Sequence, residues 1–246
     1  MEKKITPSSK RLSHKEPVSQ ECKNKRQALS QIRKLFTKKK IDFRTKNQEI
    51  LYKLINTHDI TLISGPAGTG KTYVTVFNAL STISNKDNNI DGIIIVKPLV
   101  EAAGEKIGFL PGGIDEKTDP FMLSYWHNIE KIIGKERLAI LLLSDVIKVV
   151  PLAFMRGVTF ENKIVILDEA QNALPKQIKM FLTRIGQGSK YIISGDIEQS
   201  DRVESANGLT DVIDRLRDLK PVAIHEFMHE DIVRHKLISE ILQRYP

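Results

Sequence analysis

One segment constrains the fold of this chain more than any other. Residues 60–63 are apolar or β-branched, residues 65–72 read Gly-Pro-Ala-Gly-Thr-Gly-Lys-Thr, and an apolar helical pattern begins at residue 73. The octapeptide fits the pattern G-x-x-x-x-G-K-T, in which a buried strand passes through a tight loop into a helix. A chance glycine-rich turn is the alternative, but it explains neither flanking pattern. The segment therefore predicts a strand, a phosphate-binding loop and a helix in succession.

The chemistry of the octapeptide suits a nucleoside triphosphate. Its glycines let the backbone bend so that N–H groups converge on phosphate oxygens, and the positive end of the following helix adds to the attraction. Lys71 is expected to reach the β- and γ-phosphates, and the Thr72 hydroxyl to bind Mg²⁺. The predicted cofactor-binding residues of the loop are Gly65, Pro66, Ala67, Gly68, Thr69, Gly70, Lys71 and Thr72.

The rest of the chain alternates strand-like and helical patterns. Continuous apolar strands between amphipathic helices predict an α/β fold with a mostly parallel sheet, helices on both faces and a site at the carboxyl ends of the strands. The expected strands are 60–64, 92–96, 146–150, 163–167, 191–194 and 222–226. The expected helices are 48–56, 71–84, 120–133, 135–144, 176–185, 208–219 and 232–244.

Two carboxylates follow the apolar strand at residues 163–167. Asp168 is expected to hold the metal, and Glu169 to orient or deprotonate an attacking water. A water-activating glutamate distinguishes hydrolases from kinases, which transfer the phosphoryl group to a substrate hydroxyl. The alternative is that both carboxylates only cap the next helix. Next to a phosphate loop, the pair predicts hydrolysis of the bound nucleoside triphosphate.

Two glutamines are candidates for nucleotide contacts. Gln199 follows the strand at 191–194, and its amide can bind both water and phosphate, so we expect it to sense the γ-phosphate. Gln48 precedes the first strand and is placed to read the adenine edge. The alternatives are a simple turn for Gln199 and an ordinary surface side chain for Gln48.

Charge that develops on a transferring phosphoryl group needs a cation from outside the loop. Arg156, Arg184 and Arg234 are the candidate catalytic arginines, since each lies near the end of an expected element. A surface salt bridge is the more common fate of an arginine. For Arg234 the structural alternative is an ion pair with Asp231.

Positive charge is concentrated near the amino terminus. The formal net charge is +8, but residues 1–47 alone carry +11, which leaves −3 for the remainder. Few large apolar residues occur among residues 1–40, so we expect a basic, largely disordered tail over 1–44 that precedes an ATPase domain over 45–246. A short helix over 28–36 is an alternative that the sequence leaves open. Such a tail can bind polyanions without a fold of its own.

Composition also limits the setting. A single cysteine, Cys22, excludes a disulfide framework and a cysteine-based zinc site. We find no apolar run of membrane-spanning length and no secretory segment, so we predict a cytoplasmic protein without a membrane partner.

Seven segments, taken together, resemble the motif series of PhoH-family ATPases. They are GPAGTGKT (65–72), VEAAGEKIGFLPG (100–112), PLAFMRG (151–157), ILDEAQN (166–172), KMFLTRIG (179–186), GDIEQ (195–199) and DIVRH (231–235). The resemblance implies a RecA-like P-loop NTPase core related to superfamily 1 helicases, with ATP and Mg²⁺ as cofactors. It also implies an association with phosphate starvation and RNA-directed activity. The chain departs from the family at Lys97-Pro98, where an Arg-Pro is usual, and by one extra alanine within residues 100–105.

A single core of this kind has no second core to supply an arginine in cis. If the arginine acts in trans, the site is completed by a neighbouring subunit, which predicts a ring, by analogy a hexamer. A cationic central hole would suit RNA or another single-stranded nucleic acid, with residues 110–117 as a candidate grip. The alternative is an ATP-gated assembly or regulatory switch without unwinding activity. A small-molecule kinase is disfavoured by Glu169 and Gln199.

Overall fold

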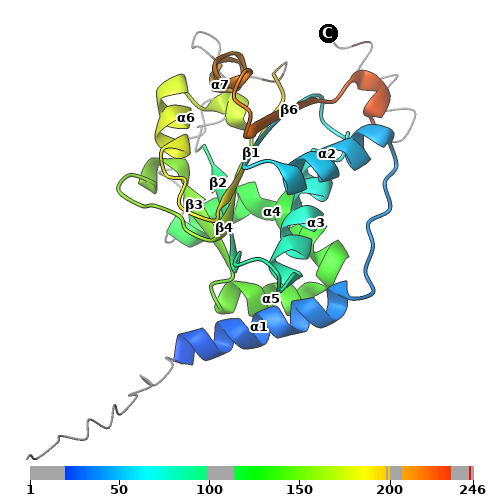
Figure 1. The fold of residues 1–246 in the computed structure, drawn as a ribbon, viewed down its shortest axis with the longest axis vertical. Coiled ribbons are helices and arrows are strands. Elements are labelled where there is room, and N and C mark those ends of the chain that lie inside the picture. The colour runs from blue at the N-terminus through cyan, green and yellow to red at the C-terminus, as the bar shows by residue number, and fades with distance from the viewer. Residues whose placement is uncertain (1–19, 99–113, 198, 200–206, 234–243, 245–246) are drawn as a thin grey trace, which may run out of the picture.

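The computed structural model describes residues 20–98, 114–197, 199, 207–233 and 244, with the side chains of 114–121 excepted. These residues form an α/β layered structure (Figure 1). The predicted grip at 110–117 and most of the helix expected at 232–244 lie outside the residues that are described in full. Arg234 is also outside them.

A six-stranded sheet, parallel throughout, forms the centre of the structure. Its strands stand in the order β3-β2-β4-β5-β1-β6. The bounds are β1 (Ile60–Ser64), β2 (Gly92–Lys97), β3 (Ile147–Pro151), β4 (Lys163–Leu167), β5 (Lys190–Ser194) and β6 (Val222–Glu226). The sequence prediction of an α/β fold with a parallel sheet is confirmed, and all six expected strands are present within one residue at either end.

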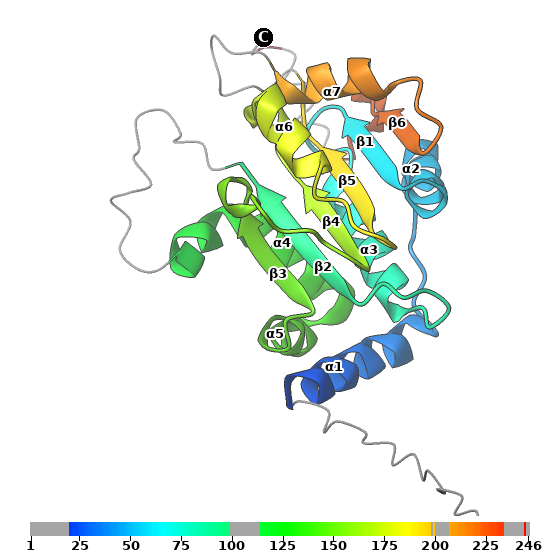
Figure 2. The same ribbon diagram turned by 60° about the vertical axis from the view of Figure 1, so that its left-hand side comes forward.

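The strands are apolar along their whole length because the sheet is covered on both faces. In β4 all residues after Lys163 are buried. One face packs against helices α2 (Lys46–Thr57), α3 (Lys71–Ser84), α4 (Ile114–Ile133) and α5 (Lys135–Leu143). The other face packs against α6 (Pro175–Leu182) and α7 (Gly208–Leu216). Figure 2 shows the two helical layers on either side of the sheet.

The amino-terminal region corrects one sequence prediction. Residues expected to belong to a disordered tail form helix α1 (Gln20–Phe36), which packs against α3 and α5. Ala28, Leu29 and Ile32 are buried, so the few apolar residues of this basic segment share one face of the helix. Composition averaged over 1–44 concealed this spacing. The expected tail therefore does not include residues 20–36, and residues 1–19 lie outside the description.

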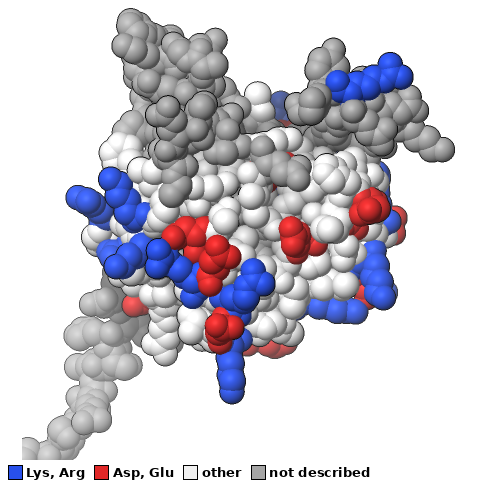
Figure 3. Space-filling model, turned by 90° about the horizontal axis from the view of Figure 1, so that it is seen from above, with Lys and Arg blue, Asp and Glu red and all other residues white. Residues whose placement is uncertain are grey.

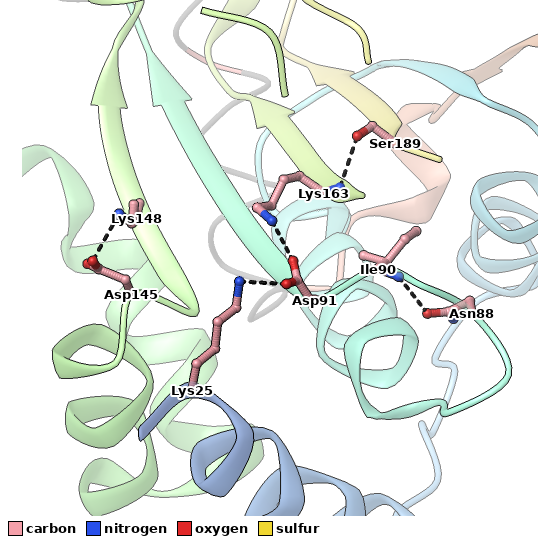
Figure 4. Close-up of polar contacts among 8 residues, drawn as sticks. All are labelled: Lys25, Asn88, Ile90, Asp91, Asp145, Lys148, Lys163 and Ser189. Atoms are coloured by element: carbon pink, nitrogen blue, oxygen red, sulfur yellow. Dashed lines mark hydrogen bonds and ion pairs between the residues drawn. The ribbon is translucent and has the colours of Figure 1, made fainter. Parts of the chain in front are cut away.

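An ion cluster attaches α1 to the sheet. Lys25 of α1 lies with Nζ 2.7 Å from Asp91 Oδ2, and Lys163 at the start of β4 binds the other oxygen of Asp91 (Figure 4). Asp91 comes directly before β2, so the cluster lies at the amino ends of the strands. Among the described helices, none combines the length and the apolar character needed to cross a membrane.

Candidate functional site

Strand order brings the predicted residues together at the carboxyl edge of the sheet. β5 lies between β1, which leads into the glycine-rich loop, and β4, which leads into the two carboxylates. Ile63 pairs with Ser194, and Leu167 with Ile193, so the three strands end at nearly the same level. A cleft of about 310 Å³ opens there. Its lining includes Gly68, Gly70, Lys71, Thr72, Asp168, Glu169, Gly195, Asp196 and Gln199.

The loop is shaped by its neighbours as well as by its own glycines. Gly65 has φ of 136°, and a Cβ at this position would lie 2.5 Å from the carbonyl oxygen of Phe227. Gly70 has φ of 88°, and its Cβ would lie 2.7 Å from Nε2 of Gln48. Both positions therefore exclude a side chain for steric and conformational reasons. Helix α3 begins immediately after Gly70, so the N–H groups of its first turn face the loop.

Lys71 lies at the mouth of the loop. Its Nζ donates to the carbonyl oxygens of Gly65 at 2.6 Å and of Pro66 at 3.0 Å. Thr69 is fully buried, and its hydroxyl donates to Pro66. These contacts hold the ammonium beside the cleft, where its charge is available to an anion.

Gln48 braces the loop from α2. Its Oε1 accepts from the backbone N–H of Arg44, and its Nε2 donates to the carbonyl oxygen of Thr69, both at 2.9 Å. The side chain is buried, and Thr45 caps the helix by accepting from the N–H of Gln48. The amide thus has a structural task that the sequence did not reveal. Its contact with adenine stays a prediction.

Asp168 is buried at the end of β4. Its N–H donates to the carbonyl of Val96, which fixes its place beside β2, and its Oδ1 accepts from the Ser194 hydroxyl at 2.8 Å. Oδ2 lies 3.6 Å from Nζ of Lys97. Asp168 and Thr72 line the same cleft and offer hard oxygen donors, which fits Mg²⁺ bound mainly by water and phosphate oxygens. Within the described residues, no group of three or more His, Cys, Asp or Glu forms a metal cluster.

Glu169 projects into the cleft from a strained backbone. Its φ is 55°, in the left-handed region that non-glycine residues rarely occupy. The residue retains exposed surface, yet protein atoms crowd its carboxylate and displace water. This loss of hydration, together with the negative charge of Asp168, raises the pKa of Glu169, although the Gln171 hydrogen bond and the charges of Lys97 and Lys71 oppose the shift.

Gln171 is a site residue to which the sequence analysis gave no role. It is buried, and its Nε2 donates to Oε2 of Glu169 at 2.8 Å. Its Oε1 accepts from the N–H of Asp196 at 3.1 Å, so one amide links the exits of β4 and β5. A Cβ on Gly195 would collide with this Oε1, so a side chain at this position would displace the Gln171 amide. In the sequence, the only sign of this role is the position of the glutamine, two residues after Glu169.

Helix α4 contributes a second group that sequence reasoning missed. Ser124 and Asn128 line the cleft, and Tyr125 is fully buried beneath it. Burial raises the pKa of Tyr125 well above its usual range, and the charges of Asp168 and Glu169 raise it further. The tyrosine hydroxyl is therefore neutral and close to both carboxylates.

The remaining predicted residues are placed differently. Gln199 lines the cleft and is exposed, with its N–H donating to the carbonyl of Asp196. Arg184 follows α6, and its guanidinium donates to Met180 and Thr183. Arg156 is exposed after β3. Neither arginine is among the described residues that line the cleft, which leaves a role across a subunit interface as a prediction for both.

Arg234 lies outside the described residues, but the chain before it reaches the loop. The N–H of Val233 donates to the carbonyl of Gly68 at 3.0 Å. Two residues earlier, buried Asp231 accepts from Asn47 of α2 at 2.7 Å. The segment after β6 is therefore fastened to both the phosphate loop and α2.

Comparison with known proteins identifies the family of this chain. The sequence profile of PhoH-like proteins matches residues 40–246. The chain belongs to the PhoH family. A PhoH-like protein of Mycobacterium tuberculosis is 41% identical over 203 residues, which cover 82% of this chain and 57% of that relative. A PhoH-like protein of Bacillus subtilis is 39% identical over 208 residues, covering 84% and 64%.

Protein PhoH of Escherichia coli is 37% identical over 196 residues, with 78% of this chain and 54% of that protein covered. The chain thus spans less than two thirds of the length of these PhoH relatives. Among solved structures, a Pif1 helicase from Candida albicans superposes with a TM-score of 0.40 at 13% identity, covering 82% of this chain and 44% of the helicase. The P-loop NTPase architecture is evident from the strand order and the loop geometry themselves.

Proposed function

We propose that this PhoH-family chain binds ATP with Mg²⁺ in the cytoplasm and hydrolyses it. The observation that carries the proposal is the position of Glu169 in the same cleft as Lys71 and Thr72. The Nε2 of Gln171 donates to Oε2 of Glu169 at 2.8 Å and so orients its carboxylate. A carboxylate with a raised pKa beside a phosphate loop suits the activation of water.

Each residue has a distinct part in the proposed reaction. The loop N–H groups and Lys71 bind the triphosphate, while Thr72 and Asp168 are the protein ligands of the metal. Bound Mg²⁺ would neutralise charge on the phosphates. Glu169 takes the proton of the attacking water, and Gln199 binds the terminal phosphate group from the end of β5. The negative charge that develops on the phosphoryl oxygens is stabilised by Lys71.

A second hollow supports a place for the nucleoside. It measures about 470 Å³, adjoins the loop at Gly68 and Gly70, and is also lined by Arg44, Gln48, Tyr73, Asn128 and Lys131. An aromatic ring and amide groups beside a phosphate site suit a purine base and its ribose. We assign the adenine of ATP to this hollow.

Coupling to RNA or another single-stranded nucleic acid, and assembly as a hexameric ring, complete the proposal. Exposed cations on α1 support it, since Lys23, Arg26 and Lys34 face solvent while the opposite face packs on the core. On the face seen from above, Lys and Arg side chains lie around the rim and are interspersed with Asp and Glu (Figure 3). In the ring, Arg156, Arg184 or Arg234 of one subunit would complete the site of the next.

A second candidate function is an ATP-gated assembly or regulatory switch without unwinding. The hydrogen bond from Val233 to the carbonyl of Gly68 favours it, because a loop that adjusts to nucleotide would pull on the segment after β6. The two functions use the same site. They differ in whether nucleic acid changes turnover.

The test is ATP turnover with and without single-stranded RNA at two salt concentrations, with Glu169→Gln as the blank. Stimulation that fades at high salt is the result expected of a nucleic-acid-coupled ATPase. Turnover that is indifferent to RNA, with oligomerisation that follows nucleotide, would favour the switch. Removal of residues 1–19 leaves α1 in place and should reduce both RNA affinity and its salt dependence. Absence of any turnover in the unmodified protein would contradict both functions as ATP hydrolases.

A further inference from the structure

Lys97 is a cation of the site that no part of the proposed reaction uses. It ends β2, and the pairing of Val96 with Leu167 brings it beside the exit of β4. Its Nζ lies 3.6 Å from Oδ2 of Asp168, and only 14% of its side chain is exposed. The ammonium of Lys97 therefore faces the carboxylate of Asp168.

The surroundings hold the ammonium in place. Nζ lies 5.6 Å from the centre of the Tyr125 ring, a distance at which the ring face attracts a cation. Tyr125 is fully buried in α4. On the other side, Oδ1 of Asp168 is engaged by Ser194, so Oδ2 is the oxygen that faces Lys97. Lys71, by comparison, donates to the carbonyls of its own loop.

We propose that Lys97 balances the charge of Asp168 when no metal is bound, and thereby makes metal binding depend on the triphosphate. A lone divalent cation must approach Asp168 against the charge of Lys97, and so binds weakly. A cation that arrives with the triphosphate brings its own negative charge, which offsets the repulsion. Lys97 is a positioning residue in this account, since it acts through Asp168. The inference rests on the proposed function only for the assignment of the metal to Asp168.

Mn²⁺ alone is the probe, and its binding to the nucleotide-free protein is measured by the electron paramagnetic resonance signal of free Mn²⁺. Lys97→Met keeps the length of the side chain and removes the charge. We expect Mn²⁺ to bind this variant at least about tenfold more tightly than the unmodified protein, because repulsion at a few ångströms is lost. Lys97→Arg keeps the charge and should bind Mn²⁺ as the unmodified protein does.

Lys148→Met is the matched control. Lys148 lies on the neighbouring strand β3 and pairs with Asp145 at 3.0 Å at the exposed surface (Figure 4). The substitution makes the same change in net charge away from the site, so Mn²⁺ affinity should stay within about twofold of the unmodified value. If Lys97→Met does not fold, Lys97→Gln replaces it in the same comparison.

Equal or weaker Mn²⁺ binding in folded Lys97→Met would overturn the inference, as would an equal gain in Lys148→Met.

A double-mutant cycle tests the pairing of Lys97 with Asp168 without metal. Asp168→Asn should lower the melting temperature more in the unmodified background than in Lys97→Met, since only the former leaves a lysine charge without its partner. Equal losses would contradict the pairing. Neither measurement needs ATP hydrolysis, so an inactive protein that shows the tenfold gain would refute the proposed ATPase and keep this inference.

Discussion

The two ends of strands β2 and β4 each carry a lysine–aspartate cluster, and the clusters differ in how completely their charges are paired. At the amino ends, Asp91 contacts both Lys25 and Lys163, and 42% of its side chain is exposed. At the carboxyl ends, Asp168 has 8% exposure, one lysine at 3.6 Å, and a second carboxylate beside it. Lysine and aspartate therefore pair fully at the amino edge of the sheet, whereas at the carboxyl edge the carboxylates outnumber the lysines beside them.

The pKa values of the carboxyl groups at the two edges reflect this difference in pairing. Partial burial raises the pKa of Asp91, but hydrogen bonds from Lys163 and Lys25 outweigh it and the net pKa is lowered. Loss of hydration and the charge of Asp168 raise the pKa of Glu169. One edge stabilises its carboxylate and holds a helix. The other edge pairs its carboxylates incompletely, which leaves them able to bind a cation that arrives with the triphosphate.

The largest effect is expected at the carboxyl edge, from Glu169→Gln. Turnover should fall by about 10²–10⁴-fold, because the amide cannot accept a proton from water. Nucleotide affinity, measured with a fluorescent ATP analogue, should change little. Glu161→Gln, at an exposed glutamate outside the cleft, is the control. Undiminished turnover in Glu169→Gln would show that another group activates the water.

Lys71→Ala tests whether the lysine of the loop carries binding. We expect triphosphate affinity to fall at least about a hundredfold, since a charge-assisted contact with phosphate is lost. Lys25→Ala removes a lysine from the amino edge and should leave that affinity unchanged. Comparable losses of triphosphate affinity in the two variants would contradict the assignment of triphosphate binding to the carboxyl edge alone.

Gln171→Met examines how Glu169 is held. The substitution keeps the approximate volume but removes the donor to Glu169 and the acceptor for Asp196. We expect kcat to fall about tenfold while nucleotide affinity is retained, because only the orientation of Glu169 is disturbed. A parallel loss of nucleotide affinity would indicate that the cleft itself has collapsed.

The smallest effect is expected at the amino edge, from Asp91→Asn. The free energy of unfolding should fall by about 1 kcal/mol or less, as is usual for half-exposed ion pairs, with turnover unchanged. Because the folded-state pKa is lowered, the contribution is fully present above the ordinary carboxyl pKa and is lost as pH falls through the lowered value. Urea unfolding measured from pH 7 downward tests this, because the difference between the unmodified protein and Asp91→Asn should shrink once pH falls below the ordinary carboxyl pKa. A difference that keeps its pH 7 size down to the lowest pH at which both proteins fold would contradict it.

Sequence periodicity was sufficient for the fold, because buried parallel strands are continuous apolar runs and their bounds follow from composition. It failed at α1, where three apolar residues among many charges form a packed face. For the site, strand-end residues such as Asp168 and Glu169 could be grouped because parallel strands end at one edge. Gln171, Lys97 and Tyr125 were given no role in the site, since their importance depends on side-chain contacts between the exit of β4, β2 and α4 that no local pattern encodes.

The contacts around the glycine-rich loop bear on its use in protein engineering. The carbonyl of Phe227 excludes a side chain at Gly65, and the Gln48 amide lies against Gly70 and donates to Thr69, so the loop takes its shape from the exit of β6 and from α2. An octapeptide transplanted alone into another scaffold would lose both constraints. A portable phosphate-binding unit from this chain has to include α2 and the end of β6, two segments separated in sequence by most of the sheet.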